Sequence, residues 1–333
     1  METEGLNETL TASGPGPGGS RSGDPNAPAG GRLGRYIVLS KLGAGAMGIV
    51  FAAHDPELDR KVAIKLLKLG EWDGNDARLR LQREAQALAR LAHANVVAVY
   101  DVGVHENQLF LAMEFVSGQT LGAWMRSAPQ PRPWRDVVHV FVQAGRGLAA
   151  AHGAGLIHRD FKPDNGMISD DGHVRVMDFG LARASASPES KAPAEKTNPE
   201  TEPSPPETRA LASELTQSGA MLGTPAYMSA EQLNRQPADA RSDQFSFCVA
   251  VYEALYGERP FDSRNLVELI FAVNQGEVRD APQGSSVPAW LRKVVVRGLA
   301  RSPEDRHVSM QALLDALAAD PAIRAVSGLL AAA

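Results

Sequence analysis

Apolar positions begin to alternate with polar ones at Tyr36, and from there the pattern predicts a strand-rich segment followed by a helix-rich one. Short apolar runs separated by Gly, Asp and Pro turns indicate the strands. A run of good helix formers predicts a helix over about residues 76–91, and a long Ala- and Val-rich helix is expected over residues 134–153. After Gly118 most segments are typical of helices. The predicted strands cover residues 36–43, 49–55, 61–67, 96–104 and 108–116.

Three segments lack this pattern. Residues 1–32 are rich in Gly, Pro and Ser and contain too few large apolar residues to offset the entropy of ordering, which predicts a disordered tail. Residues 184–210 combine Pro, Ser, Glu and Thr without a large apolar residue, which predicts a flexible insert. Residues 317–333 are interpreted as a C-terminal tail.

Composition narrows the class of protein. The chain has 333 residues, of which 44% are apolar, so it can bury a sizeable core in two lobes. The net charge of -5 argues against nucleic-acid binding driven by bulk charge. Cys248 stands alone, which excludes a disulfide framework and fits a reducing compartment. With neither a secretory signal nor a long apolar run in the sequence, we expect a cytoplasmic protein without a membrane span.

A glycine-rich loop follows the first predicted strand and reads Leu42-Gly43-Ala44-Gly45-Ala46-Met47-Gly48-Ile49-Val50. Glycines let a backbone approach phosphate oxygens without an intervening side chain. The same glycine spacing occurs in dinucleotide-binding loops, and a plain hairpin turn would also explain it. A dinucleotide fingerprint opens a helix, whereas this loop runs into a predicted strand, which favours a hairpin that covers phosphates.

Lys65 ends the apolar run Val62-Ala63-Ile64-Lys65, where an unpaired ammonium group is costly to bury. A phosphate and a carboxylate from a nearby helix would satisfy it, and Glu84 on the predicted helix can supply that carboxylate. Considered singly, Lys65 could be an ordinary edge-strand lysine and Glu84 a residue on a solvated helix face. The motifs that follow favour the pair.

The most specific pattern is His158-Arg159-Asp160-Phe161-Lys162-Pro163-Asp164-Asn165, followed by Asp178-Phe179-Gly180. Phosphoryl transfer needs a carboxylate that orients the attacking hydroxyl and accepts its proton, cations against the phosphates, and hard oxygen ligands for magnesium. Asp160, Asn165, Asp178 and the lysines supply these groups. A polar loop and an incidental turn would explain each motif alone, but not their order behind the glycine loop and Lys65.

Together these motifs resemble those of the eukaryotic-like, Hanks-type serine/threonine protein kinases of bacteria. The resemblance covers about residues 36–316 and implies an α+β, bilobal protein kinase fold. The small strand-rich N-lobe would span about residues 36–116, the larger helical C-lobe about residues 117–316, and the insert would lie in the activation segment. The implied activity is transfer of the γ-phosphate of ATP to Ser/Thr hydroxyls of proteins, in signal transduction.

The resemblance also implies a nucleotide site. The glycine loop would cover the ATP phosphates, and Lys65 would grip the α- and β-phosphates while pairing with Glu84. Met113 would guard the back of the pocket, and the backbone from Glu114 to Val116 would hydrogen-bond adenine. Ala63 and Met167 would sandwich the ring, although each can also be an ordinary core residue. The predicted set is Leu42, Gly43, Ala44, Gly45, Ala46, Met47, Gly48, Ile49, Val50, Ala63, Lys65, Met113, Glu114, Val116 and Met167.

For the chemical step, the resemblance implies that Asp160 is the catalytic base and that Lys162 neutralises charge at the γ-phosphate. Asn165 and Asp178 would hold Mg²⁺, or Mn²⁺ in its place. Lys162, two residues after the base, is similar to the lysine of Ser/Thr kinases rather than the loop of tyrosine kinases.

Regulatory positions follow in the same way. Arg159 would pair with a phosphate on the activation segment and so order it. Thr216 and Ser218 are predicted autophosphorylation sites, with ordinary loop residues as the alternative. Thr224, in a Gly-Thr-Pro sequence, would touch Asp160 and matches the Ser/Thr pattern. Relatives of this kind often activate as dimers, so a homodimer is allowed for autophosphorylation.

Two further positions resemble supporting residues of the family, and the triplet that partners one of them differs from the family pattern. Asp243 resembles the buried aspartate that braces the catalytic loop, and Arg306 resembles the arginine that pairs with the glutamate of an alanine-proline-glutamate triplet. That triplet reads Ser229-Ala230-Glu231 here, so the glutamate remains but the rigidity of proline is lost.

Two alternatives belong to other classes. A pseudokinase usually lacks the lysine, the base or the metal aspartate, and Lys65, Asp160 and Asp178 are all present. A kinase-like phosphotransferase for small molecules tends to lack the activation segment and the long helical end, and both occur in this sequence. Labelling of a protein rather than an aminoglycoside would separate the last alternative from a protein kinase.

Overall fold

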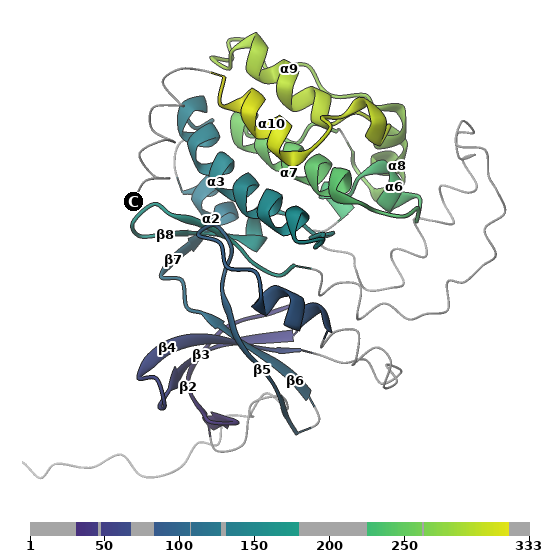
Figure 1. The fold of residues 1–333 in the computed structure, drawn as a ribbon. Coiled ribbons are helices and arrows are strands. Elements are labelled where there is room, and N and C mark those ends of the chain that lie inside the picture. The colour runs from purple at the N-terminus through teal and green to yellow at the C-terminus, as the bar shows by residue number, and fades with distance from the viewer. Residues whose placement is uncertain are drawn as a thin grey trace, which may run out of the picture.

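The computed structural model describes residues 31–45, 48–67, 83–106, 108–127, 131–179, 225–261 and 263–319. Figure 1 shows a strand-rich part formed by the first third of the chain and a helical part formed by the rest, with a small sheet where the two parts meet. No helix in the described ranges has the length and apolar character that a membrane span requires.

The strand-rich part is a six-stranded antiparallel sheet in the order β1-β2-β3-β4-β6-β5. Its central strand β4 is buried from Val62 to Leu67, and every residue of that run except Lys65 is apolar, because both faces of the strand are covered. Val62, Ile64 and Leu66 join a core cluster on one face, while Ala63 and Leu67 join another on the opposite face. The strands are β1 (Arg32–Leu33), β2 (Tyr36–Gly45), β3 (Gly48–Asp55), β4 (Arg60–Leu67), β5 (Val99–His105) and β6 (Gln108–Glu114).

Residues 83–89 are helical and connect the two parts. Ala85 packs in the cluster on the Ala63 face of the sheet, whereas Leu88 belongs to the core of the helical part. The expected helix over residues 76–91 is therefore seen from residue 83, and residues 76–82 lie outside the described residues.

The helical part is organised around α7, most of whose side chains are buried, including Ser242, Asp243 and Gln244 at its start. The long helix expected at 134–153 is confirmed as α3 with the same bounds. The helices are α2 (Leu121–Arg126), α3 (Trp134–Gly153), α6 (Ala230–Leu233), α7 (Ala240–Tyr256), α8 (Leu266–Gln275), α9 (Ala289–Gly298) and α10 (Met310–Leu317), with 3-10 turns η2 (Pro163–Asn165), η3 (Pro225–Tyr227) and η4 (Pro303–Asp305).

A second sheet of three short strands was not expected from the sequence. It has the order β7-β8-β9, formed by Gly118–Thr120, Gly166–Ser169 and Val174–Val176. Its edge is tied to the segment before β5, because the Val97 N–H donates to the Val176 carbonyl and the Val176 N–H to the Asn95 carbonyl, both at 2.9 Å. Strands of three or four residues are too short to produce a readable alternation, which explains why the pattern missed them.

The ends of the domain differ slightly from expectation. Arg32 and Leu33 form β1 by pairing with Ile37 and Tyr36, and Leu33 is fully buried, so the folded region begins before Tyr36. The structure thus corrects the assignment of Arg32 to a disordered tail, since burial of Leu33 fixes its neighbour in the sheet. The rest of that tail up to residue 30, the insert at 184–210 and residues 320–333 lie outside the described residues.

Candidate active site

The glycine loop joins two antiparallel strands, as the sequence favoured, with Gly45 opposite Gly48 in the register of β2 and β3. Gly48 has φ +146°, and a Cβ added there would lie 2.0 Å from the carbonyl oxygen of Leu66, so no other residue fits. A Cβ added at Gly43 or Gly45 would meet no atom within 4 Å. Ala46 and Met47 lie outside the described residues.

The apolar residues predicted for the nucleotide site fall into two sets. Val50, Ala63, Met113 and Val116 share one cluster on the face of the sheet that also receives Ala85. Ile49 packs in the cluster on the opposite face and is therefore a core residue of the sheet. Leu42 and Ala44 lie exposed on β2, and Met167 lies half-buried on β8.

Glu114 ends β6 where the chain leaves the strand-rich part. Its N–H donates to the Ala98 carbonyl at 2.9 Å, and its carboxylate pairs with Arg175 of β9 at 3.0 Å. These contacts tie the connection between the two parts to the small sheet. The backbone segment that was predicted to hydrogen-bond adenine is thus fixed at its first residue, Glu114.

Two ion pairs span the two parts of the molecule. Lys65 Nζ lies 2.8 Å from Asp178 Oδ1, and the ammonium side chain is only 5% exposed. Arg159 Nη1 lies 3.7 Å from Glu84 Oε1. The pair expected between Lys65 and Glu84 stays a prediction.

The catalytic-loop motif brings its predicted side chains together around Asp160. The ammonium group of Lys162 donates to Asp160 Oδ2 at 3.1 Å. The amide of Asn165, which ends the 3-10 turn η2, donates to the Asp160 carbonyl at 2.7 Å and lies 3.5 Å from Oδ2. Asp160 is buried, with 6% of its surface exposed, so its carboxylate is presented in a fixed orientation.

Asp243 supports the catalytic loop by accepting hydrogen bonds from its backbone, which confirms the expectation for that residue. Its Oδ1 accepts the Arg159 N–H at 2.7 Å, and its Oδ2 accepts the His158 N–H at 2.7 Å. The same Oδ2 lies 2.8 Å from His152 Nε2. Arg159 adopts φ +64°, an uncommon conformation for a residue with a side chain, and the two backbone bonds hold it there.

Asp178 is brought to the same place through the backbone next to it. The Met177 N–H donates to the Asn165 carbonyl at 2.9 Å, and the Met177 carbonyl lies 2.9 Å from His158 Nε2. Asp178 itself has φ +66°, and the ring of Phe179 packs 4.8 Å from the His158 ring. A carboxylate, an amide, a second carboxylate and two lysines therefore converge between the two parts.

Behind Met113 a small cavity of about 20 Å³ lies between the helix of residues 83–89 and Phe179. That volume is close to the space that one water molecule needs. Met113, Asp178 and Phe179 in its walls were singled out from the sequence, whereas the other lining residues were not, because isolated apolar residues carry no motif. They are Leu88, Val97, Val99, Leu111, Met113, Met177, Asp178 and Phe179.

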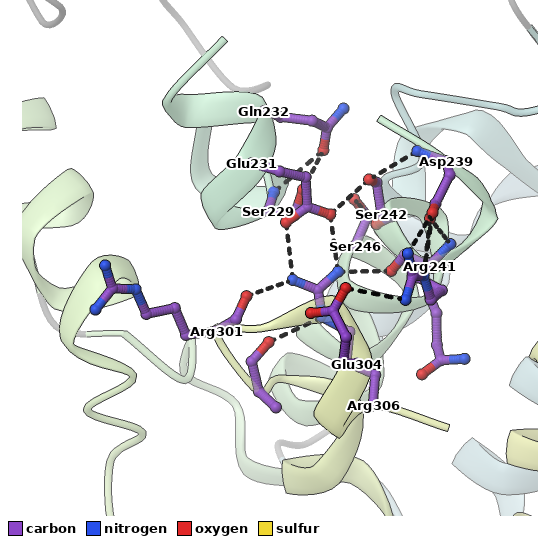
Figure 2. A network of polar contacts seen from close by, with 12 residues as sticks. Ser229, Glu231, Gln232, Asp239, Arg241, Ser242, Ser246, Arg301, Glu304 and Arg306 are labelled. Atoms are coloured by element: carbon purple, nitrogen blue, oxygen red, sulfur yellow. Dashed lines mark hydrogen bonds and ion pairs between the residues drawn. The ribbon is translucent and has the colours of Figure 1, made fainter. Parts of the chain in front are cut away.

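A buried ion pair anchors α6, as expected for Glu231 and Arg306. Figure 2 shows the guanidinium of Arg306 facing the carboxylate of Glu231, with N–O distances of 2.8 and 2.9 Å. The Ser242 hydroxyl also donates to Glu231 at 2.6 Å. Burial alone would raise the pKa of Glu231, but the hydrogen bonds and charge of Arg306 hold that pKa below its ordinary value.

Gln232 is a polar residue that the sequence interpretation missed. Its amide donates to the Arg159 carbonyl at 2.7 Å, next to Asp160. The sequence did contain a signal, since Ser229 and Gln232 have the spacing of a helix capping box. Thr216, Ser218 and Thr224 lie outside the described residues.

The described residues contain no group of three His, Cys, Asp or Glu side chains that could hold a metal ion. Mg²⁺ often takes one or two protein oxygens and completes its shell with substrate phosphates and water. Asn165 and Asp178 supply amide and carboxylate donors of that kind.

Comparisons with known proteins agree on one family. Residues 36–317 match the family model of the protein kinase domain. Serine/threonine-protein kinase PknL of Mycobacterium tuberculosis is 37% identical over 297 residues, which cover 87% of this chain and 67% of that protein. Serine/threonine-protein kinase PrkC of Bacillus subtilis is 30% identical, over 82% of this chain and 38% of its own length. The crystal structure of the Mycobacterium tuberculosis PknI kinase domain has a TM-score of 0.62 and 26% identity, and covers 87% of this chain and 98% of that one.

Proposed function

Because this chain belongs to the protein kinase domain family, and within it to the serine/threonine kinases of the bacterial Hanks type, we propose that the site between its two parts transfers the γ-phosphate of ATP to Ser or Thr hydroxyls of proteins. One observation carries the proposal. Side chains from β4, the catalytic loop and the segment after β9 converge there, linked by the contacts of Lys65, Asp160, Asn165 and Asp178.

Asp160 is proposed as the base that orients the substrate hydroxyl and receives its proton. Its buried carboxylate is held by the side chains of Lys162 and Asn165, so it needs little reorganisation. Lys162 places a positive charge beside the carboxylate, where negative charge on the transferred phosphoryl group is stabilised.

The nucleotide is proposed to lie beneath the glycine hairpin. At Gly48 the backbone approaches the carbonyl of Leu66 too closely for a side chain, so the end of the hairpin packs closely against β4. Val50, Ala63 and Met113 supply an apolar wall for the base, with Met167 on the opposite side, and Lys65 supplies the cation for the α- and β-phosphates. Each of these roles stays a prediction.

The family uses ATP with a divalent metal ion, and we propose Mg²⁺, or Mn²⁺ in its place, with Asn165 and Asp178 as its ligands. When bound, the ion neutralises phosphate charge. Asp178 lies in a left-handed conformation against Lys65, so the lysine already presents its charge to the place where the phosphates would be.

Regulation is proposed to act through Arg159. Its guanidinium lies beside Glu84 here, and a phosphate on Thr216 or Ser218 would offer that guanidinium a doubly charged partner. Arg159 would then exchange Glu84 for that phosphate. Autophosphorylation of these residues, with a homodimer as the reacting species, and a cytoplasmic location are parts of the same proposal.

The test is phosphoryl transfer by the purified chain with labelled ATP, Mg²⁺ and a generic Ser/Thr protein substrate. Asp160→Asn should lower kcat by about 10² or more while leaving the Kd for ATP within about twofold. Asp59→Asn is a matched control, because Asp59 is 97% exposed and its φ of +44° suits asparagine.

Mass spectrometry of the same reaction should find phosphate on Thr216 or Ser218 in the wild-type chain but not in Asp160→Asn. Equal labelling by wild type and Asp160→Asn would exclude catalysis at this site. ATP binding without transfer would indicate a pseudokinase, and labelling of an aminoglycoside in place of protein would indicate a small-molecule phosphotransferase.

A further inference from the structure

The side-chain amide of Gln232 connects two segments that lie far apart in the sequence. Its Nε2 donates to the Arg159 carbonyl at 2.7 Å. Its Oε1 lies 3.1 Å from both the N–H and the hydroxyl of Ser229, and accepts from them. Figure 2 shows Gln232 at the start of α6 beside Ser229. One half of the amide therefore closes the helix cap, and the other half contacts the catalytic loop.

At the catalytic loop, the contact reaches the residue before the proposed base. The Arg159 N–H is held by Asp243 at 2.7 Å, and the Arg159 carbonyl is held by Gln232. Arg159 has φ +64°, a conformation that persists only where the surroundings fix it. The carbonyl held by Gln232 belongs to the peptide group that leads directly into Asp160. Rotation of that peptide group would turn the Asp160 carboxylate away from its place.

At the other end, Gln232 is attached to a rigid support. Its neighbour Glu231 is 6% exposed and is bonded to Arg306 and to Ser242 of α7. The Leu233 side chain beyond it is fully buried. A donor that projects from such a support can hold a backbone group in place at little entropic cost.

We infer that Gln232 is a positioning residue for phosphoryl transfer, whose amide N–H fixes the Arg159–Asp160 peptide group and thereby the direction of the Asp160 carboxylate. The inference rests on the proposed function, because it assigns Gln232 an effect on the reaction at Asp160. The same bond connects α6 to the base through the Arg159–Asp160 peptide group. α6 follows the segment that ends at Tyr227.

The chemistry of this position separates the two contacts. In a capping box, Glu serves as well as Gln, because the cap needs only an acceptor. The bond to the Arg159 carbonyl needs a donor, which glutamine has and glutamate lacks. Gln232→Glu therefore keeps the cap and removes the donor, whereas Ser229→Ala removes the hydroxyl of the cap and keeps the donor.

The experiment measures kcat, the KM for ATP and the melting temperature of the purified chain for wild type, Gln232→Glu and Ser229→Ala. Gln232→Glu should lower kcat by about tenfold, as expected for the loss of one hydrogen bond in the transition state, with the KM for ATP within about twofold. Ser229→Ala should lower the melting temperature by about 2–4 °C with kcat within about twofold.

A donor-only variant provides a second readout. Gln232→Lys offers a donor without an acceptor, and Gln232→Met offers neither in a side chain of similar length. Gln232→Lys should retain more of the wild-type kcat than Gln232→Met, although both lose the cap and should melt at similar temperatures. This comparison decides the question even if Gln232→Glu does not fold.

The inference is overturned if Gln232→Glu keeps wild-type kcat, if Ser229→Ala loses as much kcat as Gln232→Glu, or if Gln232→Lys and Gln232→Met have equal kcat. An inactive wild-type chain would instead refute the proposed function. The two failures are thus distinguishable in one set of measurements.

Discussion

Removal of the Arg306 side chain tests whether the buried ion pair holds the helical part together. All five guanidinium N–H groups have an acceptor at hydrogen-bond distance. Nη1 donates to Glu231 Oε1 and the Arg241 carbonyl at 2.8 Å, Nη2 to Glu231 Oε2 and the Arg301 carbonyl at 2.9 Å, and Nε to the Ala300 carbonyl at 2.8 Å. Arg306→Ala would leave three carbonyls and a carboxylate without these donors.

The size of the effect follows from burial. The side chain of Arg306 is 0% exposed and that of Glu231 is 7% exposed, so water cannot replace the lost bonds without opening the structure. Breaking a buried pair by removing one partner costs about 3–5 kcal/mol of unfolding free energy. In a domain of this size such a loss lowers the melting temperature by about 6–20 °C.

A lower pH should reduce the difference in unfolding free energy between the wild type and Arg306→Ala. In the wild type the pKa of Glu231 lies below its ordinary value despite burial, so the ion pair stabilises the fold above the unfolded pKa and the contribution is lost as pH falls through the lower, folded pKa. In Arg306→Ala the lowering effect of Arg306 is lost, and burial raises the pKa of the Glu231 carboxyl. Protonation then relieves the buried charge, so the gap in stability between the two proteins should narrow from pH 7 to about pH 4.

Urea unfolding followed by tryptophan fluorescence at several pH values provides the assay. Arg264→Ala is the matched control, because Arg264 is exposed and its contact to Glu268 is made by its backbone N–H, which alanine keeps. It should change stability by less than about 0.5 kcal/mol. A double variant, Glu231→Gln with Arg306→Met, should lose less than Arg306→Ala, because no charge is left buried. An Arg306→Ala loss no larger than that of the control would refute the reasoning.

Two further substitutions test the glycine hairpin and the support of the catalytic loop. Gly48→Ala should cost about 1–3 kcal/mol in urea unfolding, because its Cβ would meet the Leu66 carbonyl, whereas Gly43→Ala should cost less than about 0.5 kcal/mol; equal costs would contradict this. Asp243→Asn places an amide donor against N–H groups of His158 and Arg159, so it should cost about 1–3 kcal/mol and lower kcat more than the KM for ATP changes; an unchanged kcat would exclude the proposed bracing.

The sequence predicted the large elements because their burial is periodic or continuous. The run from Val62 to Leu67 is apolar except at Lys65 because both faces of β4 are covered, and this made it recognisable. The expected strand at 96–104 starts later, at Val99, because Val96 makes only an isolated bridge to Val176. A partner elsewhere in the chain set that boundary, and no local pattern encodes it.

The site was predictable to the extent that its chemistry is local. His158, Asp160 and Asn165 lie within one loop, so their spacing was a signal in itself. Gln232 contacts the same loop although it lies far along the chain, and its capping-box spacing indicated only the start of a helix. Contacts between a side chain and a distant backbone carbonyl leave no trace in the pattern of residue types, because every residue has a carbonyl.

The sequence could not predict, for a different reason, which of the four charged side chains between the two parts pair with each other. Lys65 and Arg159 are cations and Glu84 and Asp178 are anions, so each cation has two possible partners, and charge alone does not choose between them. The structure shows the pairs of Lys65 with Asp178 and of Arg159 with Glu84, and the second of them depends on how the helix of residues 83–89 lies on the sheet. Successive residues of a helix point about 100° apart, so a rotation of that helix changes the distances from Glu84 to both cations. The inventory of groups is therefore a property of the sequence, whereas their pairing is a property of the packing.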